Sequence, residues 1–383
     1  MSRFYFDHNA TTPVSPASGE ALAAALCEVW GNASSVHREG QAARHRLEAA
    51  RAAVATLIGA GHKEIVFTSG GTESANLALL GYVRAVERPR RHIVTTAIEH
   101  PAVLNAAMQL EREGVAVTVV SPDANGLVDP ASIRDAISPD TVLISVMHAN
   151  NETGVIQPIS EIARIAQGNG IAVHSDGVQA AGKTLVDVAA LGVDLYSISG
   201  HKFYAPKGIG ALFVREGVRL QPLQWGGRHE RSRRAGTENV PGAIAMGVAA
   251  ATVDASDNVR IAHLRDRLEE AVLHRIPDTA INGAGPRLPN TANFRFHGIE
   301  GEAAVIALDL KGFAVSSGSA CSSGAVEPSH VLLAMGQAPE QARSSVRISL
   351  GAGNTADQVD RLVDALVTAV AHLRRLSPAY AHA

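Results

Sequence analysis

Hydrophobic positions follow two alternating patterns over most of this chain. Short runs rich in apolar and β-branched residues recur at intervals, and segments with helical spacing of apolar residues separate most of them. The runs are EIVFT (64–68), HIVTTA (92–97), VAVTVV (115–120), TVLISVM (141–147), IAVHSD (171–176), LYSIS (195–199) and GALFV (210–214). Continuous apolar runs are typical of strands buried on both faces, so the pattern predicts a mainly parallel sheet wrapped by helices.

The pattern changes after about residue 255. Long amphipathic helices are predicted over 259–275 and 358–376, and they bracket short strands around 290–296 and 345–350. This mixture is typical of a smaller α+β domain. We therefore expect an α/β fold with a large domain over 15–255 and a small domain built from 1–14 with 256–383.

Length and composition are those of a globular enzyme with a large and a smaller domain. The chain has 383 residues, of which 19% are charged and 46% hydrophobic. A formal net charge of −3 offers no electrostatic reason to expect nucleic acid or an anionic membrane as a partner. The N-terminus lacks the apolar segment of a signal peptide, and no apolar run is long enough to span a membrane. We expect a cytoplasmic protein.

The chain has two cysteines, too far apart in sequence to suggest a disulfide framework or a thiol-rich metal site. Cys27 lies in the helical pattern EALAAALCEVW, which predicts a thiol packed in the core. Cys321 lies in VSSGSACSSGA, where no apolar bulk would bury it. An exposed loop suits a nucleophile that must meet two partners, although a merely tolerated surface thiol is the alternative.

Lys202 and Asp176 form the strongest pair of candidate site residues. Lys202 is central in SGHKFYAPKG, and Asp176 ends an apolar strand in HSDGVQ. A carboxylate at such a position is costly unless it meets a cation, and a protonated pyridine nitrogen is one. Pyridoxal phosphate needs an amine for its aldehyde, an acid at its ring nitrogen and a phosphate cradle. Taken alone, Lys202 would be better explained as a solvated loop residue; together with Asp176 and a phosphate loop, the functional interpretation is favoured.

Polar residues follow the other predicted strands and could complete such a site. TSGGT (68–72) opens a helix with two glycines, which suits a phosphate but also an ordinary capped helix start. His100 follows the strand at 92–97, and Asn150 and Asn151 follow the strand at 141–147. Ligands of open α/β folds bind at this edge of the sheet. A helix-start histidine and an ordinary turn are the alternatives.

Taken together, these segments resemble the cysteine desulfurases of the NifS/IscS type, which are fold-type I pyridoxal-phosphate enzymes. The resemblance covers nearly the whole chain, and the order of its motifs makes it specific. In this family's usual Gly-Asn-Pro-Ser-Ser motif, Ala33 replaces the proline here. The motifs are FDHNATTPV, FTSGGTES, IEHPAV, HANNETGV, HSDGVQAAGK, SGHKFYAPKGIGAL, RRAGTENV, LPNTAN, SSGSACSSGAVEPSHVL and SSVRISLG.

The resemblance implies a role for each matching position. Lys202 would anchor the cofactor, Asp176 would pair with its ring nitrogen, and His100 would stack on the ring. Gln179 and Asn151 would contact the ring oxygen, and Arg347 would bind the substrate carboxylate, with Asn151 also near the substrate. The phosphate would be held by Gly71, Thr72, Ser199, Gly200 and His201, and by Thr237 of a neighbouring subunit, which implies a homodimer.

The implied reaction converts L-cysteine to L-alanine and leaves the sulfur as a persulfide on Cys321. An iron–sulfur scaffold or another sulfur-acceptor protein would then collect it, and Cys321 would touch a metal only transiently, through a partner's 2Fe–2S cluster. An aminotransferase would use Lys202 and Asp176 without Cys321. A non-enzymatic sulfur carrier would need only Cys321. A metal hydrolase is excluded because no HExxH or comparable ligand spacing occurs.

Overall fold

The structure is a computed structural model that describes residues 3–317, 327–377 and 380. All seven predicted strands are present and form one sheet with the order β2-β8-β7-β6-β5-β3-β4. Strands β3 to β7 are parallel to one another, whereas β8 is antiparallel to both β2 and β7. Their bounds are β2 Ile65–Thr68, β3 His92–Thr96, β4 Ala116–Val120, β5 Thr141–Ser145, β6 Ala172–Asp176, β7 Leu195–Ser199 and β8 Gly210–Val214.

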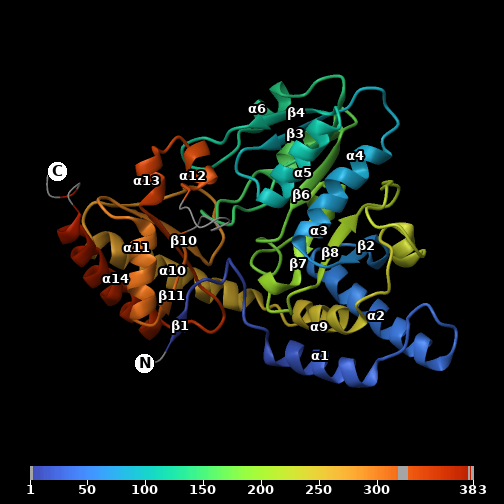
Figure 1. Cartoon of the computed structure of the whole chain (residues 1–383), viewed down its shortest axis with the longest axis horizontal. Helices are drawn as coiled ribbons and strands as arrows, with labels where there is room; N and C mark the ends of the chain where they lie inside the picture. The colour runs from blue at the N-terminus through green and yellow to red at the C-terminus, as the bar shows by residue number, and fades with distance from the viewer. Residues whose placement is uncertain (1–2, 318–326, 378–379, 381–383) are drawn as a thin grey trace.

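Helices cover both faces of this sheet, which explains why its strands read as continuous apolar runs. Ile65 and Phe67 of β2 belong to the core cluster of α2 and α9, whereas Val66 between them packs with α3 and α5. Figure 1 shows α2 and α9 on one side of the sheet and α3 to α5 on the other. The helices are α1 Pro16–Glu28, α2 Arg38–Leu57, α3 Gly71–Asn76, α4 Tyr82–Ala85, α5 Pro101–Arg112, α6 Pro130–Asp135, α7 Ile159–Gln167, α8 Val188–Leu191 and α9 Val240–Ala251.

A second group of elements follows α9 and has its own apolar cluster. A three-stranded antiparallel sheet has β10 between β9 and β12, and the N-terminal strand β1 pairs in parallel with β11. The predicted helices and strands of this region are confirmed; α10 and α14 begin a few residues earlier than expected. The elements are β1 Phe4–Tyr5, α10 Ala255–Arg275, β9 Thr279–Ile281, β10 Thr291–Phe296, α11 Gly301–Leu310, β11 Phe313–Ala314, α12 His330–Ala334, α13 Pro339–Arg343, β12 Ser345–Ser349 and α14 Ala356–Leu376.

The prediction that Cys27 is buried is wrong. It lies in α1 as expected, but its side chain is exposed, and the neighbouring Leu26 is 63% exposed. The reason is that α1 contacts α9 through small residues, as where Ser18 Oγ donates to the Ala245 carbonyl at 2.8 Å. In this single chain α1 therefore presents its larger apolar side chains outward. Among the described residues, no helix has the length and apolar character needed to cross a membrane.

Candidate active site

The candidate site lies where the parallel strands β3, β5, β6 and β7 end. Carboxyl ends of parallel strands share one edge of a sheet, so the residues that follow them meet there. They surround a cavity of about 360 Å³. Arg347, on β12 of the second group of elements, also lines it. The predicted residues that the cavity brings together are Gly71, Thr72, His100, Asn151, Asp176, Gln179, Ser199, His201, Lys202 and Arg347.

Asp176 is the last residue of β6 and its side chain is buried. Its Oδ1 accepts a hydrogen bond from the Val178 amide at 2.9 Å. Burial raises the pKa of Asp176, and the nearby His100 and Lys202 only partly oppose this effect. A cationic group entering the cavity would therefore be stabilised by this carboxylate.

Lys202 ends the short 3₁₀ helix Gly200–Lys202 that follows β7. Its Nζ donates to the carbonyl oxygens of Asn9 at 2.5 Å and Ala10 at 2.8 Å. Burial, followed by the charge of Arg347, lowers the pKa of Lys202 to about 8, against the opposing carboxylates of Asp176 and Asp7. An amine that loses its proton near neutral pH can react with an aldehyde and can exchange protons.

Arg347 offers a planar set of donors at the wall of the cavity. Its Nη2 donates to Asp7 Oδ1 at 2.8 Å, and its Nη1 donates to the Asn151 carbonyl at 3.0 Å. Its Nε is buried and has no hydrogen-bond partner among the described residues. A guanidinium held in one orientation with a donor to spare suits a carboxylate ligand.

The predicted phosphate cradle is only partly supported by the geometry. A Cβ at Gly71 would lie 2.8 Å from Val178 Cγ2, so a larger residue at this wall would require Val178 to shift. Ser199 and His201 line the cavity, and His201 Nδ1 lies 3.1 Å from Thr11 Oγ1. Burial, with the charge of Lys202, lowers the pKa of His201 to about 4, so the ring is neutral near pH 7. The amide of Gly200, in contrast, donates to the Ile209 carbonyl at 3.0 Å.

His100 is both a helix-start histidine and a residue of the cavity, so the two interpretations of its position hold together. It is the N-cap of α5, with Nδ1 accepting from the Ala102 amide at 3.1 Å, and its ring also lines the cavity. Desolvation lowers the pKa of His100 despite the attraction of Asp176. Because the cap bond uses Nδ1 as an acceptor, the neutral ring carries its proton on Nε2.

Sequence reasoning did not assign a role to Asn9, which is the centre of a buried hydrogen-bond network. Its carbonyl accepts from Gln179 Nε2 at 3.0 Å as well as from Lys202. Its side-chain oxygen accepts from Lys183 and Asn290, and its side-chain nitrogen donates to Thr291 Oγ1 and the Asn151 carbonyl. The motif FDHNATTPV was the available signal, because it contains both Asn9 and the Asp7 that pairs with Arg347.

Glu99 was also missed, although it precedes His100. It is fully buried, and its Oε1 accepts from Thr96 Oγ1 and the Met147 amide, both at 2.7 Å. Burial raises the pKa of Glu99 to about 8, so this side chain is mostly protonated at neutral pH.

Besides Gly200, two of the predicted residues are not placed in this cavity. Cys321 lies outside the described residues, so its roles as sulfur acceptor and transient metal contact stay predictions. The chain that follows is anchored beside the site: Ser329 Oγ donates to Glu152 Oε2 at 2.5 Å, and His330 Nε2 lies 2.9 Å from the Glu99 carbonyl. Thr237 is exposed and does not line the cavity in this single chain.

Comparisons with known proteins agree with this geometry. A cysteine desulfurase IscS of Methanosarcina thermophila is 47% identical over 378 residues, covering 98% of this chain and 93% of the relative. A cysteine desulfurase of Trichormus azollae is 46% identical over 382 residues, covering 99% and 95%.

Solved structures show the same fold. A NifS-like protein superposes with a TM-score of 0.90 at 35% identity, covering 97% of this chain and all of its own. A structure described as SspA in complex with cysteine has a TM-score of 0.82 at 35% identity and covers 90% and 98%. The predicted α/β, fold-type I architecture is confirmed. Residues 4–362 match the aminotransferase class-V family model, and the chain belongs to that family.

Proposed function

We propose that this chain is a pyridoxal-phosphate-dependent cysteine desulfurase that converts L-cysteine to L-alanine. The observation that carries the proposal is one cavity lined by a buried acid, an amine of lowered pKa and a guanidinium: Asp176, Lys202 and Arg347. The names of the curated relatives, at 46–47% identity over almost the whole chain, support the same activity.

The residues of the cavity fit this cofactor. The buried carboxylate of Asp176 would hold the proton of the ring nitrogen, and Lys202 would hold the aldehyde. Gln179 and Asn151 would contact the ring oxygen, and His100 would lie against the ring. Gly71, Thr72, Ser199 and His201 would hold the phosphate. When bound, pyridoxal phosphate supplies an electron sink that makes the α-hydrogen of an attached amino acid acidic.

The chain's own groups then have distinct tasks. Arg347 binds the carboxylate of L-cysteine with its planar donors and so sets the orientation of the α-carbon. The amine of Lys202, whose pKa is about 8, removes a proton at the α-carbon and returns one later. Asp176 keeps a proton on the ring nitrogen during both transfers.

Cys321 accepts the sulfur. Its thiolate attacks the substrate sulfur, a sulfur–sulfur bond forms, the carbon–sulfur bond breaks, and the carbon retains that electron pair and takes up a proton. The net change is L-cysteine plus a thiol to L-alanine plus a persulfide, which needs no other oxidant or reductant. An iron–sulfur scaffold or another acceptor protein in the cytoplasm would remove the sulfur.

A homodimer completes the proposed site, because Thr237 would reach the phosphate bound by the partner subunit. The exposed position of Thr237 is compatible with this role. Sedimentation should show a dimer, and a fully active monomer would contradict the assignment of Thr237.

The decisive experiment uses the two cysteines as test and control. The holoenzyme is exposed briefly to L-cysteine without reductant or keto acid, alanine is measured, and the protein is examined by mass spectrometry. We expect alanine and one added sulfur on Cys321. Cys321→Ala should still bind the cofactor but release no alanine, whereas Cys27→Ala should behave as wild type. Normal turnover by Cys321→Ala, or a requirement for a keto acid, would favour an aminotransferase instead.

A further inference from the structure

Lys183 is a buried amine with no assigned role. It lies in the turn between β6 and α8, with its side chain 8% exposed. Its Nζ donates to Gln179 Oε1 at 2.5 Å and to Asn9 Oδ1 at 3.0 Å, which are both neutral amide oxygens. Burial lowers the pKa of Lys183 well below its usual range, and the charges of Lys202 and Arg347 lower it further. A lysine buried at such a cost calls for an explanation.

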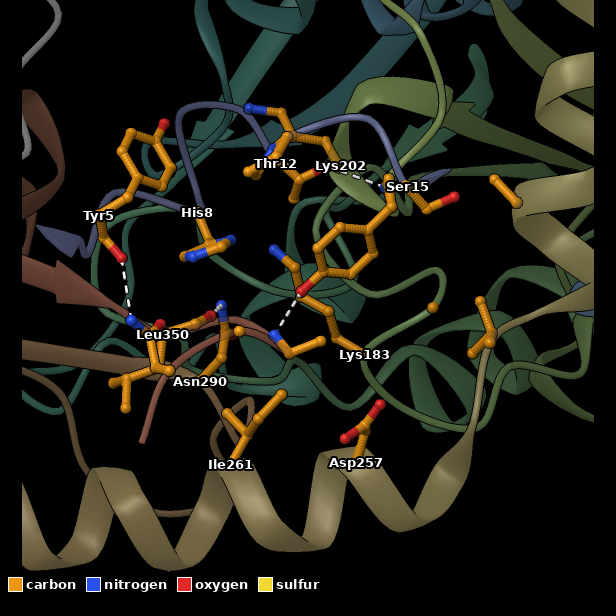
Figure 2. A pocket seen from close by; sticks show the side chains of 18 of the residues that line it. Tyr5, His8, Thr12, Ser15, Lys183, Lys202, Asp257, Ile261, Asn290 and Leu350 are labelled. Atoms are coloured by element: carbon orange, nitrogen blue, oxygen red, sulfur yellow. Dashed lines mark hydrogen bonds between the residues drawn. The ribbon is translucent and has the colours of Figure 1, made fainter. Parts of the chain in front are cut away.

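Lys183 does not line the active-site cavity, whereas Gln179 and Asn9 do. Lys183 instead lines a second cavity of about 660 Å³, which it shares with Lys202. Figure 2 shows both lysines there, together with Asn290. Lys183 therefore hydrogen-bonds to the active site through these two amides, and its charge also contributes to the lowered pKa of His201.

Those contacts decide which end of the Gln179 amide is the donor. The two ends of a glutamine amide have nearly the same shape, so hydrogen-bond partners alone choose its orientation. Lys183 can only donate when charged, and its bond to Oε1 places Nε2 on the side of Asn9 and the cavity. The Asn9 carbonyl takes one hydrogen of Nε2, and the second has no partner within the part of the chain that the structure describes, so a ligand can accept it.

The second contact of Lys183 acts on Lys202. Lys183 and Asn290 both donate to Asn9 Oδ1, which fixes the side chain of Asn9 from two directions. The carbonyl of the same residue accepts from Lys202 Nζ at 2.5 Å. The resting position of the Lys202 amine thus depends on a residue that Lys183 holds in place.

We propose that Lys183 is a positioning residue for cofactor binding: it orients Gln179 so that Nε2 donates to the ring oxygen of pyridoxal phosphate, and it holds Asn9 against Lys202. The inference rests on the proposed function, because it requires this cofactor in the active-site cavity.

A double-mutant cycle tests whether Lys183 acts on cofactor binding through Gln179. Lys183→Met, Gln179→Leu and the double variant are prepared as apoenzymes and titrated with pyridoxal phosphate, and the visible absorption band of the bound cofactor is recorded. We expect each single substitution to weaken binding about tenfold, the effect of one lost hydrogen bond to an ionised oxygen. In the Gln179→Leu background, Lys183→Met should change the affinity less than it does in the wild type, because only its contact with Asn9 remains to be lost.

Two further variants separate positioning from a general loss of charge or fold. Lys63→Met removes an exposed lysine and should bind as wild type. Lys183→Arg keeps a donor, has room beside the second cavity, and should restore the absorption band and an affinity within about threefold of wild type. It also provides the test if Lys183→Met fails to fold.

The outcomes distinguish this inference from the proposed function. Wild-type affinity and absorption in Lys183→Met, or multiplicative effects of the two substitutions, would overturn the positioning role. A borohydride-reduced label on Lys183 rather than Lys202 would also overturn it, because Lys183 would then be the reacting amine. Failure of the wild-type enzyme to bind pyridoxal phosphate at all would instead refute the proposed function.

Discussion

Two buried groups of charged residues lie at different edges of the same sheet. At the β2 edge, Arg51 Nη1 and Nη2 donate to the carboxylate of Glu230 at 2.6 and 2.8 Å. The same two side chains also hydrogen-bond to the backbone of β2: Glu230 accepts from the Phe67 amide, and Arg51 donates to the Ile65 carbonyl. At the carboxyl edge, the side chains of Lys202 and Asp176 hydrogen-bond only to neutral backbone groups among the described residues.

The pKa shifts of the two groups differ accordingly. Burial alone would lower the pKa of Arg51, but the hydrogen bonds and charge of Glu230 raise it above its usual value. Burial lowers the pKa of Lys202 and raises that of Asp176, because nearby opposite charges do not compensate for it. The complete ion pair contributes to the stability of the fold. The separated charges at the cavity are instead available to bind a ligand that carries complementary groups.

The largest effect on stability should come from breaking the complete pair. Arg51→Met leaves Glu230 buried without a cation and should lower the free energy of unfolding by about 3–5 kcal/mol. Urea denaturation measures this change. Arg267→Met, which removes an exposed ion pair with Asp360, is the control and should leave the denaturation midpoint unchanged. Equal effects of the two substitutions would contradict the structural role of the Arg51–Glu230 pair.

Asp176→Asn should strongly reduce activity without reducing stability. The rate of alanine formation should fall on the order of 10²-fold or more, because an amide cannot keep the ring nitrogen protonated. The apoenzyme should be as stable as wild type or more stable at pH 7, since the raised pKa means that the ionised carboxylate destabilises the fold. Steady-state kinetics and urea denaturation of the same preparation check both parts. Unchanged turnover would exclude the role of Asp176.

Glu99→Gln should change how stability depends on pH. The unfolded chain loses the Glu99 proton near pH 4.5, whereas the folded protein keeps it until about pH 8. Between these values the folded state binds more protons, so this residue makes the protein less stable as the pH rises, by at most about 1.4 kcal/mol per pH unit. Glutamine resembles the protonated acid and does not titrate. The free energy of unfolding of the variant, measured by urea denaturation, should therefore increase relative to that of wild type from pH 5 to pH 8. Glu111→Gln, at an exposed position, is the control. A difference in free energy of unfolding between Glu99→Gln and wild type that does not change with pH would contradict the prediction.

The smallest effect is expected at Cys27. Because its side chain is exposed, Cys27→Ser should change the free energy of unfolding by no more than about 0.5 kcal/mol. In the native wild type Cys27 should react rapidly with a thiol reagent, and peptide mapping should find that label separately from any label on Cys321. The Cys27 label should be absent in the variant. A thiol that reacts only after denaturation would show that α1 is covered in solution, as it would be by a second subunit.

Much of the large sheet and of the site was predictable because local patterns carry the information. The seven apolar runs predicted β2 to β8. Six of these strands are buried along their whole length and so lack polar alternation, whereas the edge strand β4 is partly exposed. Strand ends then predicted the neighbourhood of His100, Asn151, Asp176 and Lys202. Cys27 was mispredicted because α1 has helical spacing of apolar residues but packs through small ones, and periodicity alone does not reveal which face is covered.

By itself the sequence determined the order of elements, the family resemblance and the residue types available for chemistry. Only the tertiary structure decided that Asn9, from the N-terminal segment, joins Gln179, Lys183 and Lys202 in one network. It also brought Arg347, from the C-terminal part, to the cavity and to Asp7. These contacts join residues more than 150 positions apart, and hydrogen bonds across such separations depend on how the sheets pack, which no local pattern encodes.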